Sequence, residues 1–173
     1  MKDVKAVFDI GNHSVKMVVI GHEENRHSVL HKSQETTTFM RKGKILDSEN
    51  FLATINKLTE SAIQKLGGDY IDEAIISVSH PDMKISRIKE QKRIMKEFVS
   101  NDDIQHLSNI VHEISQENNF EITKVVPVHR TIDEHKKEKD PVGMQASKLE
   151  ITADVFLLPR NFYHTILDVF DRI

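Results

Sequence analysis

The apolar residues of this chain change their spacing several times, and these changes constrain the fold more than any other feature of the sequence. Residues 4–10 form a mostly apolar run that Asp9 interrupts near its end, a pattern typical of a strand buried on both faces. A second run, 14–20, is rich in β-branched residues and follows at hairpin distance, and a weaker run covers 26–33. The three segments predict an antiparallel meander.

A helical spacing follows between residues 47 and 66. Asp47 or Ser48 provides its N-terminal cap and Gly67–Gly68 its stop. The apolar residues of this helix are Phe51, Leu52, Ile55, Leu58, Ala62, Ile63 and Leu66. Residues 72–79 then return to the pattern of a buried strand, which ends at Pro81 because proline has no N–H to donate to a sheet. We therefore expect a domain boundary here, with one domain over 1–80 and another over 81–173.

The pattern after Pro81 predicts a small strand-helix-strand-strand-helix domain. A polar, basic segment over 83–95 indicates an edge strand, and a helix over 101–117 starts at residues that resemble a capping box, Ser100 and Asp103. Strands over 123–132 and 147–158 are joined by a charged segment, 133–145, expected to be a solvated loop. A last helix over 161–173 lacks a C-terminal cap, so we expect the chain to be part of a longer protein. The fold class is α+β.

Composition excludes several classes of protein. An apolar content of 38% and a charged content of 29% are those of a soluble globular protein, and no apolar run approaches the roughly 20 residues that span a bilayer. The amino terminus lacks a signal-peptide pattern, which predicts a cytoplasmic location. The absence of cysteine excludes disulfides, thiolate metal sites and a cysteine nucleophile. A net charge of -3 gives no general attraction to nucleic acid.

A phosphate-binding turn is the most specific chemistry that the residues suggest. Consecutive N–H groups of a tight turn can bind phosphate oxygens, Gly11 permits close approach, and Lys16 supplies a positive charge. Asp9 would hold a metal-bound water, because two anions in direct contact repel each other. A polar hairpin tip, in which Asp9 only hydrogen-bonds the turn, is an equally good interpretation of the residues alone. The candidate cofactor-binding residues are Asp9, Gly11, Asn12, His13, Ser14 and Lys16.

These residues resemble the first phosphate loop of the superfamily that includes actin, heat-shock chaperones and sugar kinases, whose opening hairpin carries an Asp-x-Gly turn. The glycine spacing matches neither a Walker loop nor a Rossmann fingerprint. Within that superfamily the chain resembles the FtsA family of cell-division proteins. The segments that carry the resemblance occur in the family's order: VFDIGNHSVKMVVI (7–20), MRKGKILDSENFLATINKLTESA (40–62), IDEAIISVSHPDM (71–83) and DPVGMQASKLEITADVFLL (140–158).

The resemblance implies a fold and a set of partners. Residues 1–80 would be the first part of an actin-like (ribonuclease H-like) subdomain, called 1A, and 81–173 an inserted domain, called 1C. The intact protein would bind ATP and magnesium with a second lobe absent here, so this chain would bind ATP weakly or not at all. The resemblance implies no catalytic or metal-ligating residue in this chain and at most a weak ATPase in the intact protein. His13 departs from the small residue that many relatives carry.

The resemblance further implies that the intact protein links FtsZ filaments to the inner face of the cell membrane at the division site and recruits other division proteins. Its membrane contact would be a carboxyl-terminal helix absent from this chain. Domain 1C would serve in self-association and in contacts with division proteins. Two alternatives stay open: a pilus-assembly adaptor resembling PilM, and a sugar-kinase-type phosphotransferase that uses Asp9 and would need an additional catalytic base.

Two further groups of residues invite hypotheses. His22, His27 and His31 could hold a metal, but their spacing does not specify a closed site, and solvated histidines are the better interpretation. A basic run over 84–96 could attract an acidic partner, yet a charged edge strand that prevents sheet-to-sheet aggregation explains it better. The basic residues are Lys84, Arg87, Lys89, Lys92, Arg93 and Lys96.

Overall fold

The computed structural model describes residues 3–23, 26–67, 71–134 and 136–173, and divides the chain into two compact units. Unit 1 comprises residues 1–81 and 161–173, and unit 2 comprises 82–160. Unit 1 contains β1 (Asp3–Ile10), β2 (Ser14–Glu23), β3 (Arg26–Thr36), β4 (Met40–Arg41), β5 (Lys44–Ile45), α1 (Ser48–Lys65), β6 (Glu73–Val78) and most of α3 (Arg160–Phe170). Unit 2 contains β7 (Lys84–Arg93), α2 (Asn101–Ile114), β8 (Phe120–Ile132), β9 (Lys136–Glu138) and β10 (Lys148–Pro159).

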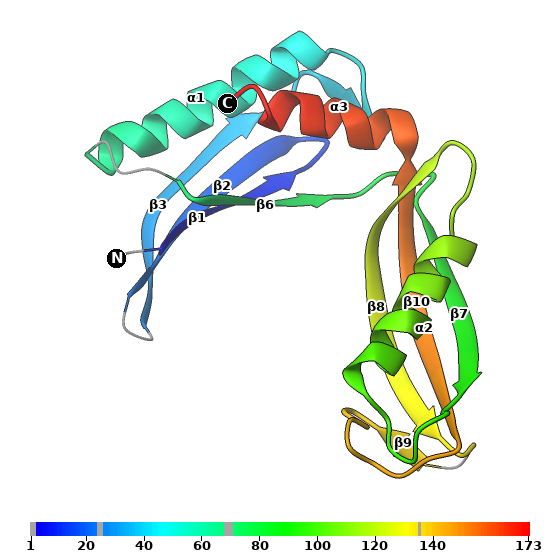
Figure 1. Ribbon diagram of the computed structural model, residues 1–173. Coiled ribbons are helices and arrows are strands. Elements are labelled where there is room, and N and C mark those ends of the chain that lie inside the picture. The colour runs from blue at the N-terminus through cyan, green and yellow to red at the C-terminus, as the bar shows by residue number, and fades with distance from the viewer. Residues whose placement is uncertain (1–2, 24–25, 68–70, 135) are drawn as a thin grey trace. The chain divides into compact units, whose positions relative to one another are not determined.

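The main sheet of unit 1 has the strand order β3-β2-β1-β6 (Figure 1). β1, β2 and β3 form the predicted antiparallel meander. β6 pairs with β1 in parallel, a direction that the sequence pattern did not specify. β6 is also the edge of the sheet and Ile75 is 47% exposed, whereas its apolar pattern had predicted burial. The α1 helix between β5 and β6 makes the parallel return possible, since a parallel connection needs a crossover.

Two helices cover one face of this sheet, and aromatic residues fill the core beneath them (Figure 1). Phe51 of α1 stacks on Phe39 with a centroid distance of 4.7 Å, and Phe170 of α3 meets Phe8 edge-on at 5.0 Å. α3 thus belongs to unit 1, although the sequence placed residues 161–173 in the second domain. The buried face of α3 explains the difference, because it contributes Phe162, Ile166 and Val169 to the apolar core.

The ends of α1 follow local rules. Asp47 is the N-cap, and its carboxylate accepts the Asn50 N–H at 3.0 Å. After the C-cap Leu66, Gly67 has a φ of 71°, as expected for a glycine that stops a helix. Gly68, the other predicted stop residue, lies outside the described residues.

A short hairpin, β4–β5, precedes α1 and was not predicted. Lys42 and Gly43 form its turn with φ values of 51° and 76°. Two successive positive φ angles are the mark of a tight hairpin turn in which glycine is favoured. The Lys-Gly pair in MRKGKI was therefore a usable signal in the sequence.

Unit 2 is a sheet of order β7-β10-β8-β9 with α2 packed on one face. β7 is an edge strand, as predicted. α2 starts at the predicted capping box: the Ser100 hydroxyl accepts the Asp103 N–H, and the Asp103 carboxylate accepts the Ser100 N–H at 3.0 Å. The apolar core joins α2 to β10 through residues that include Leu107, Val111, Leu149, Ile151, Ala153, Val155 and Leu157.

Part of the charged segment 133–145 is a strand rather than a solvated loop. β9 pairs with the end of β8, and Lys136 lies opposite Ile132 in the ladder. Asp133 and Glu134 adopt φ values of 47° and 69°, which reverse the chain before β9. Charged residues suit this strand because it is short and lies at the sheet edge.

Candidate functional site

The turn between β1 and β2 brings the six predicted phosphate-binding residues to one end of the unit 1 sheet. The Gly11 N–H donates to the Ser14 carbonyl at 3.1 Å and is therefore used inside the turn. Among the described residues, no acceptor is found for the N–H groups of Asn12 and His13. A Cβ at Gly11 would lie 3.1 Å from the Ser14 carbonyl oxygen, so the tightness of the turn itself favours glycine here.

Side chains and backbone from two other segments hold this turn. The Asn12 side-chain oxygen accepts the Gly43 N–H at 2.7 Å, which ties the turn to the β4–β5 hairpin. Thr37 binds it twice: its hydroxyl donates to the Gly11 carbonyl at 2.7 Å, and its N–H donates to the His13 carbonyl at 3.0 Å. The turn is thus fixed in shape before any ligand is present, which lowers the entropy cost of binding.

Asp9 and Lys16 face each other across the β1–β2 ladder. The Lys16 Nζ lies 3.8 Å from the Asp9 carboxylate, and both side chains are more than half exposed, at 56% and 60%. An ion pair this exposed is weak, so each charge can still turn toward a ligand. Asp9, Gly11, Asn12, His13, Ser14 and Lys16 are therefore adjacent in space, but nucleotide binding by them stays a prediction.

Of the three histidines considered as metal ligands, two lie close together. The Nδ1 atoms of His22 and His27 lie 3.2 Å apart on neighbouring strands. His31 pairs with the buried Val19 farther along the ladder, and its Nε2 is buried without a hydrogen-bond partner. No group of three or more potential metal ligands occurs among the residues that the structure describes.

Four of the six basic residues in the run over 84–96 pair with acids of their own unit. Arg87 binds Asp154 with two hydrogen bonds, of 2.7 and 2.8 Å, and this contact lowers the pKa of Asp154. Lys89 pairs with Glu150 at 2.9 Å. Lys84 and Lys92 likewise pair with Glu117 and Asp103. These pairs weaken the case for an acidic partner and suit the alternative of a charged edge strand.

The negative charge of Asp103 in unit 2 is stabilised by its neighbours. Lys92, and then Ser100, donate hydrogen bonds to its carboxylate and lower its pKa to about 2. The Lys92 Nζ lies 2.7 Å from the carboxylate, and the Asp103 side chain is only 15% exposed. This contact joins the edge strand β7 to the first turn of α2, where a negative charge also favours the helix dipole.

Three exposed apolar side chains lie on or near two hydrogen-bonded segments of unit 2. Backbone hydrogen bonds join residues 97–99 to 143–146: the Val99 N–H donates to the Met144 carbonyl, and the Gly143 N–H donates to the Val99 carbonyl, each at 2.9 Å. On or beside these two segments, three apolar side chains are exposed, namely Met95 at 92%, Phe98 at 51% and Val142 at 38%. We call these three residues the unit 2 patch. Val142 directly precedes Gly143-Met144, part of the segment that carried the family resemblance.

The architecture places this chain among α+β proteins with a partial actin-like fold. The solved structure of a PilM–PilN type IV pilus biogenesis complex is similar, with a TM-score of 0.59 over 94% of this chain and 42% of that chain. At 12% identity, this likeness shows the fold alone. None of the described helices is long and apolar enough to cross a membrane.

Sequence comparison refines that class. Residues 79–157 match the model of the SHS2 domain inserted in FtsA. The chain is 22% identical over 162 residues to cell division protein FtsA of Enterococcus faecalis, and 24% identical over 164 residues to that of Enterococcus hirae. Each match covers 91% of this chain and 36% of the relative, so the chain spans about a third of the length of these relatives. Residues 79–157 are thus similar to the SHS2 domain of FtsA, and the chain resembles FtsA along most of its length, which confirms the family resemblance.

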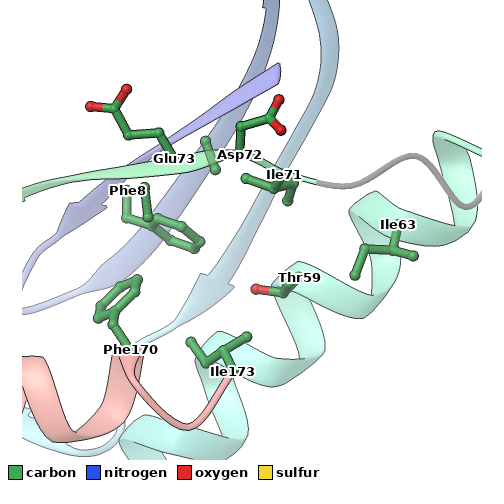
Figure 2. A pocket seen from close by; sticks show the side chains of 10 residues that line it. Phe8, Thr59, Ile63, Ile71, Asp72, Glu73, Phe170 and Ile173 are labelled. Atoms are coloured by element: carbon green, nitrogen blue, oxygen red, sulfur yellow. The ribbon is translucent and has the colours of Figure 1, made fainter. Parts of the chain in front are cut away.

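Sequence reasoning missed two features of functional interest. The first is the unit 2 patch, because exposure of Met95 and Phe98 follows from the fold and not from local spacing. The second is an apolar groove in unit 1 with a volume of about 330 Å³. Figure 2 shows Phe8 of the sheet, Ile63 of α1, and Phe170 and Ile173 at the end of the chain around this space.

Proposed function

We propose that this chain is the part of an FtsA-like cell-division protein that carries a protein-interaction domain, and that unit 2 is that domain. Its partners would be other division proteins, FtsZ among them, and further copies of the FtsA-like protein. They would meet at the inner face of the cell membrane at the division site. The observation that carries the proposal is the unit 2 patch, which lies on the SHS2 domain.

The physical case rests on exposure and rigidity. Methionine and phenylalanine are enriched in the buried centres of protein interfaces, and here both types of side chain are exposed on one small unit. The hydrogen bonds between 97–99 and 143–146 fix the backbone beneath them. A patch that is already rigid loses less conformational entropy when a partner covers it.

A fluorescent fusion of the chain, expressed in dividing cells of its own species, tests this function. We expect fluorescence at the division site, and we expect the Phe98→Asp variant to lose it, since a charge at the centre of an apolar contact is costly. Leu46→Asp is the matched control, because Leu46 is also apolar and exposed, at 70%, but lies in unit 1. Diffuse fluorescence of the unmodified fusion, or equal loss in both variants, would contradict the proposal.

We also propose that the β1–β2 turn contributes one of two phosphate contacts to an ATP and magnesium site. Its support is the pair of N–H groups at Asn12 and His13 without an internal acceptor, together with the Lys16 charge. Transfer of a phosphoryl group needs metal, clamps on the phosphates and a positioned water together. This turn alone supplies one clamp, so binding by this chain should be weak.

Chemical-shift mapping with magnesium-ATP at about 10 mM suits such a weak contact. We expect the amide signals of Asn12 and His13 to shift, and we expect Lys16→Ala to reduce those shifts. Lys57→Ala serves as control, since Lys57 is an exposed lysine paired with Glu35 at 2.8 Å on another part of unit 1. Shifts confined to other residues would rule out this turn as the phosphate site.

Because the fold is similar to that of the PilM–PilN complex, a second candidate function is that of an adaptor in pilus assembly. Localisation separates the two functions. A fusion that gathers at pilus machinery and never at the division site would favour the adaptor.

A further inference from the structure

Two histidines of unit 1 are brought together by the register of the β2–β3 ladder, which their spacing in the sequence did not specify. His22 of β2 lies directly opposite His27 of β3. Their Nδ1 atoms are 3.2 Å apart, and the centroids of the two rings are 4.5 Å apart with a tilt of 32° between the ring planes. Two ring nitrogens, the atoms through which histidine binds metals, therefore lie side by side.

The distance between these nitrogens fits a shared metal ion. Histidine nitrogens bind zinc at about 2.0–2.1 Å, so two of them on one tetrahedral ion lie about 3.3 Å apart. The observed separation of 3.2 Å is close to this value. His27 is exposed and His22 is half-buried. Because the last torsion angle of a histidine side chain has a broad range, both rings can turn until their lone pairs point at one ion.

The ladder holds the two histidines in place before a metal binds. Gly21 pairs with Ser28 on one side of them, and Glu23 pairs with Arg26 on the other. β2 and β3 run side by side from this end of the ladder to the β1–β2 turn (Figure 1). Two ligands on a fixed backbone lose less entropy on binding than two ligands on separate mobile segments.

We propose that His22 and His27 form a two-histidine site for zinc at the end of the β2–β3 ladder farthest from the β1–β2 turn. Both Nδ1 atoms bind the ion, and each ring keeps its proton on Nε2. No third histidine, aspartate or glutamate joins the pair among the residues that the structure describes, so water completes the tetrahedron. His31 takes no part: it pairs with Val19, and Val19 and His22 point to opposite faces of β2.

The position of one proton distinguishes the zinc-bound pair from the metal-free pair. Without a metal, a separation of 3.2 Å suits a hydrogen bond in which one Nδ1 carries a proton and donates it to the other. With zinc, neither Nδ1 carries a proton. The site is also separate from the proposed magnesium-ATP contact, because magnesium prefers oxygen ligands whereas imidazole nitrogen suits zinc.

Isothermal titration calorimetry with zinc chloride, on the chain without an affinity tag, tests the pair. We expect one zinc per chain at the tightest site. His22→Gln and His27→Gln should each lower its affinity about tenfold or more, since loss of even a residue that supports a metal ligand costs that much. The double variant should bind no more weakly than either single variant, because one histidine alone cannot chelate. His106→Gln is the matched control, since His106 is also exposed but lies on α2 in unit 2.

Nitrogen–proton NMR spectra of the imidazole rings identify the atoms that bind. We expect zinc to shift the Nδ1 signals of His22 and His27 and to leave a proton on each Nε2, and we expect magnesium chloride to change neither. Circular dichroism checks that each variant is folded. Unchanged zinc affinity in the two single variants, an equal loss in His106→Gln, losses that add up in the double variant, or binding through Nε2 would overturn the proposal.

Discussion

The two units of this chain are built in different ways. Unit 1 depends on contacts between segments far apart in the sequence: Phe8 meets Phe170, and Gly43 lies against Pro81. Unit 2 is one continuous segment whose surface is crossed by ion pairs such as those of Lys92 with Asp103 and Arg87 with Asp154. Substitution of a packed or strained residue of unit 1 should therefore cost more stability than substitution of a residue in the surface ion pairs of unit 2.

The edge strands of the two sheets also differ between the units. β7 in unit 2 carries alternating charges that find partners on the neighbouring strand and helix. β6 in unit 1 carries apolar residues that the unit itself leaves partly uncovered, with Ile75 47% exposed. The alternating charges of β7 protect that edge from pairing with another strand.

Phe51→Ala should have the largest effect on stability. A small effect would contradict the difference between the two units. Phe51 is fully buried between Phe39 and Phe170, so its removal leaves a cavity and should lower the free energy of unfolding by about 3–5 kcal/mol. Urea denaturation measures the loss. Hydrogen exchange should place the lost protection in unit 1 and leave α2 and β10 protected; equal loss in both units would show that they unfold together.

Gly43→Ala should follow, at about 1–3 kcal/mol in urea denaturation. Gly43 has a φ of 76°, and a Cβ there would lie 2.7 Å from Cδ of Pro81, so both backbone strain and a clash oppose the substitution. Gly67→Ala separates the two causes, because Gly67 has a φ of 71° with no atom within 4 Å of the added Cβ. If the two variants lose equal stability, the contact with Pro81 contributes nothing.

The sequence predicted most individual elements because their signals are local. The caps at Asp47 and at Ser100 with Asp103 lie where the side-chain spacing indicated. The partners of those elements could not be predicted in the same way. The apolar pattern of β6 is the same whether both faces are covered or one edge stays open, and the apolar face of α3 fits a core in either unit.

The candidate site, too, could be predicted from the sequence only in part. The Asp-x-Gly turn and the lysine on the return strand could be recognised in the sequence, and Asp9 does face Lys16. The support of the turn by Thr37 and Gly43 could not, because it depends on segments about 26 to 31 residues away that the folded sheet brings together. The unit 2 patch had no local signal either, since exposed and buried methionines look alike in a sequence.

Asp103→Asn should have a smaller effect, and one that depends on pH. The pKa of Asp103 is about 2 in the folded chain, below its ordinary value of 3.8, so its charge stabilises the fold above about pH 4. This contribution is lost as the pH falls toward 2. The variant keeps the shape of the side chain and should lose about 1 kcal/mol at pH 7. Urea denaturation at both pH values should show this difference shrinking toward zero at pH 2; a constant difference would mean that the carboxylate charge is not its cause.

Arg87→Gln should have the smallest effect of all. The Arg87 side chain is 63% exposed, so the Coulomb gain of its pair with Asp154 is screened by water and offset by the entropy of ordering two side chains. We expect the urea midpoint of the variant to match that of the unmodified chain, and we expect added salt to change neither. The pair then serves to keep the β7 edge polar rather than to stabilise unit 2. A clear loss of stability, removed by salt, would show instead that surface charges hold unit 2 together.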